Sequence, residues 1–397
     1  SHSLLLSVLL WALSILSHVV SAQVLIPMDE SQQRDHLKAY GLLYNAIEDG
    51  YDCHWLLNHR GGSFAILNAD SKLIQQALLR GVSYETSSAT QLVQLMADLK
   101  SPANNTNTVA LQRVPKIAVY SPDGAQPWDD AVTMVLEYAD IPFTTIYDTE
   151  ILDGSLGDYQ WLHLHHEDFT GQYGKFYGSY RDAAWYINQK ASFEAAALEM
   201  GFTKVSQQKL AIAKTITTFV ENGGFLFAMC SATDSYDIAL AAQKTDICES
   251  MFDGDPMAPG AAYQLDYAPC FAFKDFTLET NPLRYEYSNI DITDRRVRSM
   301  KEDSDYFELF DFSAKYDVIP TILVQNHTDL VKSFYGQTTA FSPKTLKPTT
   351  TILGSNAVDG AARYIHGTQG KGYWTFYGGH DPEDYQHRVG DPHTDLN

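Results

Sequence analysis

The spacing of hydrophobic positions predicts a strand–helix–strand unit near the start of the chain. VLIPM (24–28) is an apolar run typical of a buried strand, and DCHWLLN (52–58) is a second one. Between them, 31–50 has the period of a helix, with Ser31 as the expected N-cap and Gly50 as the end. The helical stripe consists of Leu37, Tyr40, Leu43, Tyr44 and Ile47. Such crossovers join parallel strands, so this unit predicts a parallel sheet.

The same pattern returns further along the chain. KIAVYSPDG (116–124) is a strand and loop, WDDAVTMVLEYAD (128–140) a helix, and PFTTIYD (142–148) a strand. Each unit has an aspartate just after its first strand, Asp29 and Asp123. This likeness fits either an internal duplication or the strand–helix–strand pattern that α/β folds generally share. The polar, Asn-rich stretch 101–115 between the units is typical of a linker.

The remaining pattern predicts a larger α/β domain. DYQWLHLHHEDFTG (158–171) is a strand that ends in a charged cluster, and 190–222 is a long helix with a break near Gly201. GGFLFAMC (223–230) is a buried strand, and SATDSYDIALAAQK (231–244) is the helix after it. RYEYSNIDI (284–292), VIPTILVQ (318–325) and TTTILG (349–354) resemble strands. ARYIHGTQGKGYWTFYGGH (362–380) is typical of a hairpin.

The domain organisation follows from these elements. We expect an N-terminal α/β lobe at 23–100, a linker at 101–115, and an α/β domain over 116–397 with a β-rich insertion at about 270–350. Before them, LLLSVLLWALSILSHVV (4–20) and the small residues Val20-Ser21-Ala22 predict a signal peptide over 1–22. The protein would then be exported, to the periplasm or the extracellular space. A membrane anchor is the alternative, although the segment is short for a span and contains serines.

Charge narrows the class of partner. The net charge of −21 opposes binding to nucleic acid and anionic lipid, and no dense Lys/Arg run offsets it. The 24 tyrosines suit a small-molecule or glycan ligand, although core packing explains most aromatic residues. No membrane contact is expected after signal cleavage, and the oligomeric state stays open. The chain lacks GxGxxG, GxxxxGK[ST], HExxH and GxSxG, so no nucleotide site is predicted and no cofactor is expected.

The spacing of the four cysteines is not that of a disulfide-rich scaffold. The sequence also contains no CxxC motif, which argues against a cysteine–zinc site. The sequence leaves the disulfide pairing open; if one pair forms, Cys248 with Cys270 is the favoured one, and it would leave Cys53 and Cys230 free.

Three strand ends carry reactive side chains, and open α/β sheets gather such ends at one edge. Cys230 ends a strand and opens a helix, where the helix dipole lowers a thiol pKa and favours a nucleophile. A buried core cysteine is the alternative. His380 follows two glycines and is the expected general base, with Asp381 or Glu383 orienting its ring. For His380 the alternative is a surface loop histidine.

The third strand end, HLHHEDF, holds three histidines and two acids. His163 and His165 would face one side of a strand and His166 the other. The three histidines are a candidate zinc site, and substrate binding is the competing role. The expected substrate contacts are His163, His165, His166, Glu167, Asp168, Lys175, Arg181 and Asp123.

The stretches GGFLFAMCSATDS and GYWTFYGGHDPED resemble the class I glutamine amidotransferase-like superfamily, and most closely its trehalose-utilisation-type branch. The resemblance implies a flavodoxin-like, mostly parallel sheet with flanking helices that presents cysteine and histidine in a hydrolytic triad. MDESQQRDHLKAYG, LHLHHEDFTGQYGKFY and FYGGHDPEDYQH are similar to an exported bacterial family labelled asparagine synthetase B. Here Met229-Cys230-Ser231-Ala232 lacks the glycines that flank the amidotransferase nucleophile, and the sequence shows no SGGxDS-type loop.

We therefore expect a cysteine-dependent hydrolase or acyl transferase that acts on a small amide or ester. The first alternative is a non-catalytic glycan or small-molecule binding module on the same fold. The second is glutamine-dependent asparagine synthesis, as the family label implies.

Overall fold

The computed structural model describes residues 22–122, 130–301, 304–317, 327–333 and 335–379. The expected signal segment and His380, Asp381, Glu383 and Asp123 lie outside these ranges. The chain forms two compact units. Among the described residues, unit 1 contains 22–114 together with 312–317 and His327, and unit 2 contains the others. The sequence pattern did not indicate that 312–317 belongs to unit 1.

Unit 1 is a five-stranded sheet with helices, in the strand order β4-β1-β3-β2-β5. Its elements are β1 (Ala22–Ile26), α2 (His36–Glu48), β2 (Asp52–Leu57), β3 (Phe64–Ala69), α3 (Ser71–Leu79), β4 (Glu85–Ser87), α4 (Ala89–Leu99) and β5 (Asn107–Leu111). All its strand pairs are antiparallel, so the parallel sheet expected here is wrong. A tight turn at 58–62, with Asn58 and Arg60 at positive φ, folds β3 back between β1 and β2.

The first helix starts later than the sequence predicts. Asp35 caps it by accepting a hydrogen bond from the backbone N–H of Lys38, so Ser31 is not the cap. Gly50, at φ 86°, follows the helix end as expected. Within the stretch predicted as a linker, β5 pairs with β2.

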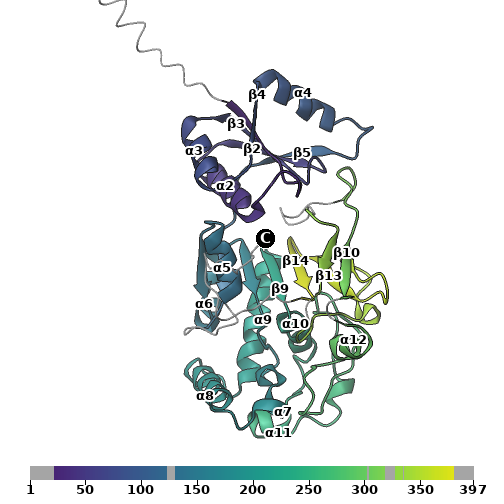
Figure 1. Ribbon diagram of the computed structural model, residues 1–397. Coiled ribbons are helices and arrows are strands. Elements are labelled where there is room, and N and C mark those ends of the chain that lie inside the picture. The colour runs from purple at the N-terminus through teal and green to yellow at the C-terminus, as the bar shows by residue number, and fades with distance from the viewer. Residues whose placement is uncertain (1–21, 123–129, 302–303, 318–326, 334, 380–397) are drawn as a thin grey trace, which may run out of the picture. The chain divides into compact units, whose positions relative to one another are not determined.

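Unit 2 combines helices with a nine-stranded sheet (Figure 1). Its strands are β6 (Ile117–Tyr120), β7 (Phe143–Ile146), β8 (Trp161–Leu164), β9 (Phe225–Met229), β10 (Tyr306–Leu309), β11 (Leu330–Lys332), β12 (Thr351–Ser355), β13 (Ala362–Gln369) and β14 (Gly372–Tyr377). Its α-helices are α5 (Asp130–Tyr138), α6 (Asp148–Leu152), α7 (Tyr177–Tyr180), α8 (Ala184–Glu199), α9 (Val205–Glu221), α10 (Ser231–Ala241), α11 (Ser250–Asp253) and α12 (Thr293–Ser299). Short 3₁₀ turns lie at Ser155–Asp158, Tyr173–Lys175, Ala261–Tyr263 and Pro343–Thr345.

The sheet of unit 2 has a parallel and an antiparallel half. Its order is β11-β10-β12-β13-β14-β9-β8-β6-β7. The pairs from β14 to β7 are parallel, and those from β14 to β11 are antiparallel. The expectation of a mixed α/β architecture is therefore confirmed. The long helix is broken as predicted, into α8 and α9 around Gly201 at φ 86°.

The described strands of the region 270–350 do not all lie where the sequence predicts them, since β10 and β11 fall outside the predicted segments. RYEYSNIDI (284–292) forms only isolated bridges, because side chains there bond to the backbone in place of a ladder. Ser288 Oγ accepts from Ile290 N at 3.1 Å, and Asn289 Oδ1 accepts from Thr277 N at 2.8 Å. VIPTILVQ (318–325) lies outside the described residues. TTTILG contributes β12, and the predicted hairpin is β13 and β14.

All four cysteines are free and buried, so the favoured Cys248–Cys270 pair is wrong. The thiols of Cys248 and Cys270 have separate hydrogen-bond partners in unit 2. Cys248 donates to Thr170 O at 3.2 Å, and Cys270 donates to Asp237 O at 3.3 Å. Across the described ranges, no helix combines the length and apolar character that crossing a bilayer requires.

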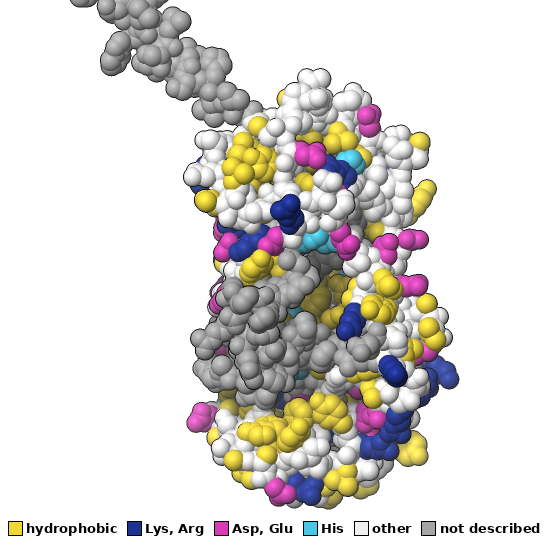
Figure 2. Space-filling view, viewed as in Figure 1, with side chains coloured by type: hydrophobic (Ala, Val, Ile, Leu, Met, Phe, Trp, Pro, Cys, Tyr) yellow, Lys and Arg dark blue, Asp and Glu magenta, His cyan; other side chains and the backbone are white. Residues whose placement is uncertain are grey.

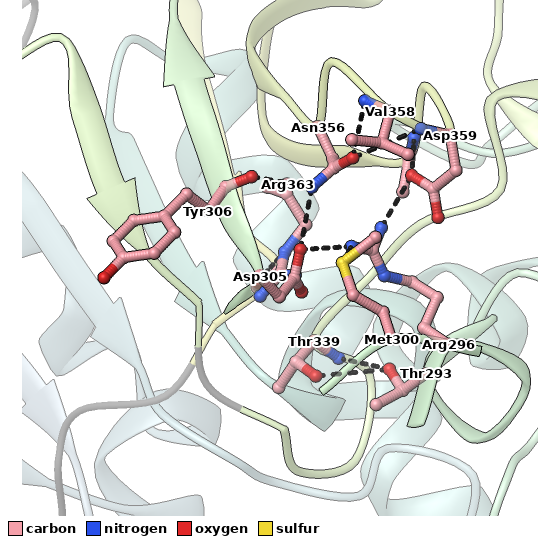
Figure 3. Close-up of polar contacts among 12 residues, drawn as sticks. Thr293, Arg296, Met300, Asp305, Tyr306, Thr339, Asn356, Val358, Asp359 and Arg363 are labelled. Carbon is pink, nitrogen blue, oxygen red and sulfur yellow. Dashed lines mark hydrogen bonds and ion pairs between the residues drawn. The ribbon is translucent and has the colours of Figure 1, made fainter. Parts of the chain in front are cut away.

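A buried ion network joins α12 and β10 to β13 (Figure 3). Asp305 is fully buried and accepts from Arg296 Nη2 at 2.5 Å and Arg363 Nη1 at 3.1 Å. Arg296 also pairs with Asp359, so the two arginines face two carboxylates. Arg363 Nε donates to Gly378 O at 2.9 Å. The network therefore fixes the end of β14.

Removing Asp305 should destabilise unit 2 strongly, because two buried guanidinium groups would lose their shared counter-charge. We expect Asp305→Ala to lower the free energy of unfolding by about 3–5 kcal/mol. Chemical denaturation monitored by tryptophan fluorescence measures this change. Asp294→Ala is the matched control, since Asp294 forms an exposed pair with Arg298 and its loss should cost about 0.5 kcal/mol or less. Equal effects of the two variants would contradict the assignment.

Candidate functional site

Cys230 lies at the junction of β9 and α10 in a strained backbone conformation. Its φ of 48° and ψ of −136° are rare for a residue with a side chain. The backbone N–H of Cys230 donates to Tyr377 O at 3.2 Å, so the ladder between β9 and β14 holds the residue in place. Backbone strain of this kind persists where the surrounding structure over-determines it, and such strain clusters at functional sites.

The thiol of Cys230 is shielded from solvent. The residue is 4% exposed, and Sγ donates to the carbonyl oxygen of Gln337 at 2.7 Å. Burial raises the pKa of the Cys230 thiol well above its usual range, while the backbone N–H of Ser231 acts in the opposite direction. The sequence predicts a lowered pKa at this helix start. Desolvation outweighs the helix terminus here, and the thiol is protonated at neutral pH.

Two buried acids share the surroundings of Cys230. Asp234 lies one turn along α10, and Asp291 approaches from the segment before α12. Thr338 links them, because its hydroxyl donates to Asp234 Oδ1 at 3.0 Å and its N–H donates to Asp291 Oδ2 at 2.8 Å. Burial raises the pKa of Asp291 to about 6 and that of Asp234 well above the usual range. The sequence analysis assigned neither acid to the site, although Asp234 lies within GGFLFAMCSATDS, because the pairing of the two acids depends on tertiary contacts through Thr338.

The histidine cluster lies at the end of β8. His163 stacks on Phe227 with ring centroids 5.3 Å apart. The rings of His165 and His166 are only 4.5 Å apart. The strand stops at Leu164, so the expected alternation of faces does not extend to His166.

The backbone carbonyls of the histidine cluster accept hydrogen bonds from residues just after Cys230. Ser231 Oγ donates to His166 O at 2.8 Å, and Ser235 Oγ donates to Glu167 O at 2.9 Å. The end of β8 is thereby attached to the first turns of α10. The structure thus brings the 163–168 cluster and Cys230 together, as the sequence predicts for neighbouring strand ends.

Metal ligation has one candidate group among the residues that the structure describes, and it is not the histidine cluster. Asp246, Cys248 and Asp253 have ligand atoms within 4.8 Å of one another. Lys204 Nζ already lies among these acids, 2.5 Å from Asp246, 2.9 Å from Asp253 and 2.5 Å from Asp255. The ammonium group of Lys204 already pairs with these carboxylates, so the group forms an ion-pair cluster.

Several expected substrate contacts instead shape the loop after β8. Asp168 accepts from Thr170 N at 2.7 Å and from Gly174 N at 2.9 Å. Glu167 Oε2 accepts from His165 N at 2.9 Å. Lys175 is buried and donates to Glu279 O at 2.9 Å, and burial lowers the pKa of its ammonium group. These bonds give the side chains a structural role in the loop.

A pocket opens at the carboxyl ends of β6 and β8, where Pro122 and His166 contribute to its wall. Its aromatic lining consists of Tyr147, Tyr173, Phe176 and Phe193. The buried Lys209 on α9 also lines the pocket and pairs with Asp148 at 2.8 Å. The sequence analysis missed Lys209, because a lysine in an amphipathic helix usually faces water.

An exposed aromatic cluster adjoins this pocket through Phe176. The ring centroids of Phe176 and Trp185 are 5.7 Å apart, and those of Tyr180 and Trp185 are 5.1 Å apart. Tyr180, Trp185 and Tyr285 are 45%, 39% and 44% exposed. Figure 2 shows hydrophobic side chains gathered on the part of unit 2 that carries α7 and α8 in Figure 1. Arg181 lies over the Tyr177 ring and donates to Gly178 O at 2.9 Å.

Replacing Asp291 should change how stability depends on pH. Its folded pKa of about 6 exceeds the unfolded value of 3.8, so folded protein binds the proton more tightly. The stabilising contribution of the neutral carboxyl is complete below about pH 4 and is lost as pH rises towards 6, a change of roughly 3 kcal/mol. Urea denaturation of wild type and Asp291→Asn at pH 4, 5, 6 and 7 measures it. The stability difference between the two proteins should shift in favour of the variant as pH rises. A constant difference would contradict the assignment.

No family model matches the chain, and no curated protein matches it. Solved structures similar to the chain include Cytoplasmic Protein STM1381 from Salmonella typhimurium LT2, at 8% identity and a TM-score of 0.33, covering 66% of this chain and 86% of that chain. Cytoplasmic Protein STM3548 from Salmonella typhimurium is 9% identical with a TM-score of 0.31, covering 66% and 87%. A beta-galactosidase from Bacillus circulans sp. alkalophilus is 11% identical with a TM-score of 0.27, covering 68% and 29%.

The names of the first two structures contradict one prediction. Both are called cytoplasmic proteins, whereas the N-terminal segment predicts export to the periplasm or the extracellular space. The predicted export is withdrawn, and no other location takes its place. Likenesses at these TM-scores support no statement about the fold or chemistry of this chain.

Proposed function

We propose that the protein is an amidotransferase-like, cysteine-dependent hydrolase or acyl transferase that acts on a small amide or ester. The observation that carries the proposal is the strained backbone of Cys230 between β9 and α10. A sharp strand-to-helix turn of this kind presents the nucleophile in α/β-hydrolases. A cysteine that served only to fill the core would not require a left-handed φ at this point.

The strand order supports a flavodoxin-like core. Numbered along the chain, the parallel strands β6, β7, β8, β9 and β14 lie in the order 2-1-3-4-5, which is the flavodoxin-like order. Cys230 follows the fourth of these strands, and the segment of His380 follows the fifth. Since β9 and β14 are parallel neighbours, their carboxyl ends lie at the same edge.

The proposed reaction proceeds through a thioester. His380 takes the thiol proton while Sγ of Cys230 attacks the acyl carbon, and Asp381 or Glu383 orients the imidazole. The tetrahedral species collapses, the C–N or C–O bond breaks, and the amine or alcohol leaves with the proton from His380. Water, or an acceptor amine or alcohol, then attacks the thioester. The thiol regains its proton as the acid or the transferred acyl product leaves.

The raised pKa of the thiol fits a base-assisted mechanism better than a preformed thiolate. The hydrogen bond from the Cys230 thiol to the Gln337 carbonyl must break when the sulfur reacts, because the base has to accept the same proton. Reactivity should therefore depend on the base.

A non-catalytic binding module on the same fold is the second candidate. The 4% exposure of Cys230 favours it, together with the open aromatic cluster of Tyr180, Trp185 and Tyr285. Stacked aromatic rings suit the apolar faces of glycans and other small ring compounds. The glutaminase step of glutamine-dependent asparagine synthesis, the third expectation, is tested when glutamine is among the substrates.

Replacing the nucleophile should abolish turnover. We expect Cys230→Ala to lower kcat/KM by about 10⁴-fold or more, because no other group forms the thioester. The assay is release of amine or alcohol from a panel of small amides and esters that includes glutamine, with intact-mass detection of an acyl group on Cys230. His380→Ala should also be inactive. Cys270→Ala, at another free buried thiol, is the control and should retain activity. Turnover that survives in Cys230→Ala would overturn the proposal, and so would a wild type that never acylates.

A further inference from the structure

Asp234 keeps one carboxyl oxygen without a partner beside the nucleophile. It is fully buried, and two adjacent residues connect it to Cys230: Gln337 O accepts the Cys230 thiol at 2.7 Å, and the Thr338 hydroxyl donates to Asp234. Its Oδ1 accepts the hydroxyl of Thr338 at 3.0 Å. Its Oδ2 has no hydrogen-bond partner in the part of the chain that the structure describes. A buried polar atom left in this way calls for an explanation, such as a catalytic role or a bound molecule.

The proton of the acid pair belongs to Asp234. Asp291 receives backbone N–H groups on both oxygens, from Thr293 and Thr338 at 2.8 Å each. These donors favour the ionised form of Asp291, and two adjacent buried carboxyls do not both ionise readily. Burial and the charge of Asp291 raise the pKa of Asp234. Since Oδ1 accepts from Thr338, the proton is on Oδ2, where it is a hydrogen-bond donor.

Tyr287 supplies a second donor of the same kind. Its side chain is 1% exposed, and among the described residues its hydroxyl finds no partner. Its segment is attached to the residue that covers Cys230, because Gln337 Nε2 donates to Tyr285 O at 2.5 Å while Gln337 O accepts the Cys230 thiol at 2.7 Å. Two buried O–H donors therefore share the surroundings of one strained cysteine.

We propose that Asp234 and Tyr287 donate hydrogen bonds to the carbonyl oxygen of the acyl group that Cys230 attacks. This inference rests on the proposed function, and it makes both side chains catalytic residues. Negative charge develops on that oxygen when the C–S bond forms, and returns to the carbonyl when the C–N or C–O bond breaks. Preorganised donors in a dry site stabilise this charge. A protonated carboxyl paired with a tyrosine is an established arrangement for the task.

The test compares two conservative variants. Tyr287→Phe removes only the hydroxyl, and we expect the rate of Cys230 acetylation by p-nitrophenyl acetate to fall about 100-fold. Asp234→Asn keeps an oxygen for Thr338 and an N–H donor in place of Oδ2–H, so its rate should stay within about 10-fold of wild type. Intact-mass spectrometry follows the acetyl group. The midpoint of thermal unfolding should not fall in either variant, because the groups removed had no partners in the described structure.

Two controls separate oxyanion stabilisation from a general effect on folding. Tyr236→Phe removes a buried hydroxyl that bonds to Thr217 and to Ala213 O, so it should lower the unfolding midpoint and leave acetylation unchanged. Alkylation of Cys230 by iodoacetamide forms no oxyanion, so Tyr287→Phe should leave its rate within about 2-fold.

The outcomes distinguish this inference from the proposed function. A wild type that is not acetylated at Cys230 would overturn the proposed function. Acetylation of wild type with an equal rate in Tyr287→Phe would overturn the inference alone. If Asp234→Asn loses the reaction while it stays folded, Asp234 acts as a carboxylate base and its role as donor is wrong.

Discussion

The parallel pairing of β9 with β14 is the interaction on which the candidate site depends. It joins Phe225–Met229 to Tyr373–Tyr377, two segments almost 150 residues apart in the sequence, in unbroken register. Its last hydrogen bond runs from Cys230 N to Tyr377 O and fixes the strained turn into α10. Every feature of the site, from the shielded thiol to the acids around it, is placed relative to this pair of strand ends.

Buried charge organises the rest of unit 2. Lys209 with Asp148 and Asp305 with two arginines are buried groups of opposite charge, and Lys204 joins three aspartates in a partly exposed cluster. Burying a charge is costly unless a partner compensates it, so these clusters specify how helices and loops attach to the sheet. The Asp234–Asp291 pair differs, because it places two acids together without a cation partner among the residues that the structure describes. One of them stays neutral, which leaves a proton available beside Cys230.

Local pattern was sufficient to predict the elements that carry the site. The run 223–230, the helix after it and the hairpin before His380 were readable because their periodicity is strong and glycines mark their ends. The strand order of unit 1 could not be predicted from the local pattern. It depends on a single turn at 58–62, which places β3 between β1 and β2. The state of the thiol was also beyond the sequence. It depends on Gln337, a residue more than 100 positions away whose carbonyl covers the sulfur.

The burial of all four thiols limits how the folded protein reacts with oxidants and disulfides. Each cysteine is buried and unpaired, and burial raises the pKa of every one of these thiols. Thiol–disulfide exchange requires an accessible thiolate, so Cys53, Cys248 and Cys270, which take no part in the proposed reaction, offer oxidants and disulfides little to react with. Since no disulfide joins the four cysteines, packing, hydrogen bonds and ion pairs hold the fold, and its architecture should not depend on whether the surroundings are reducing or oxidising.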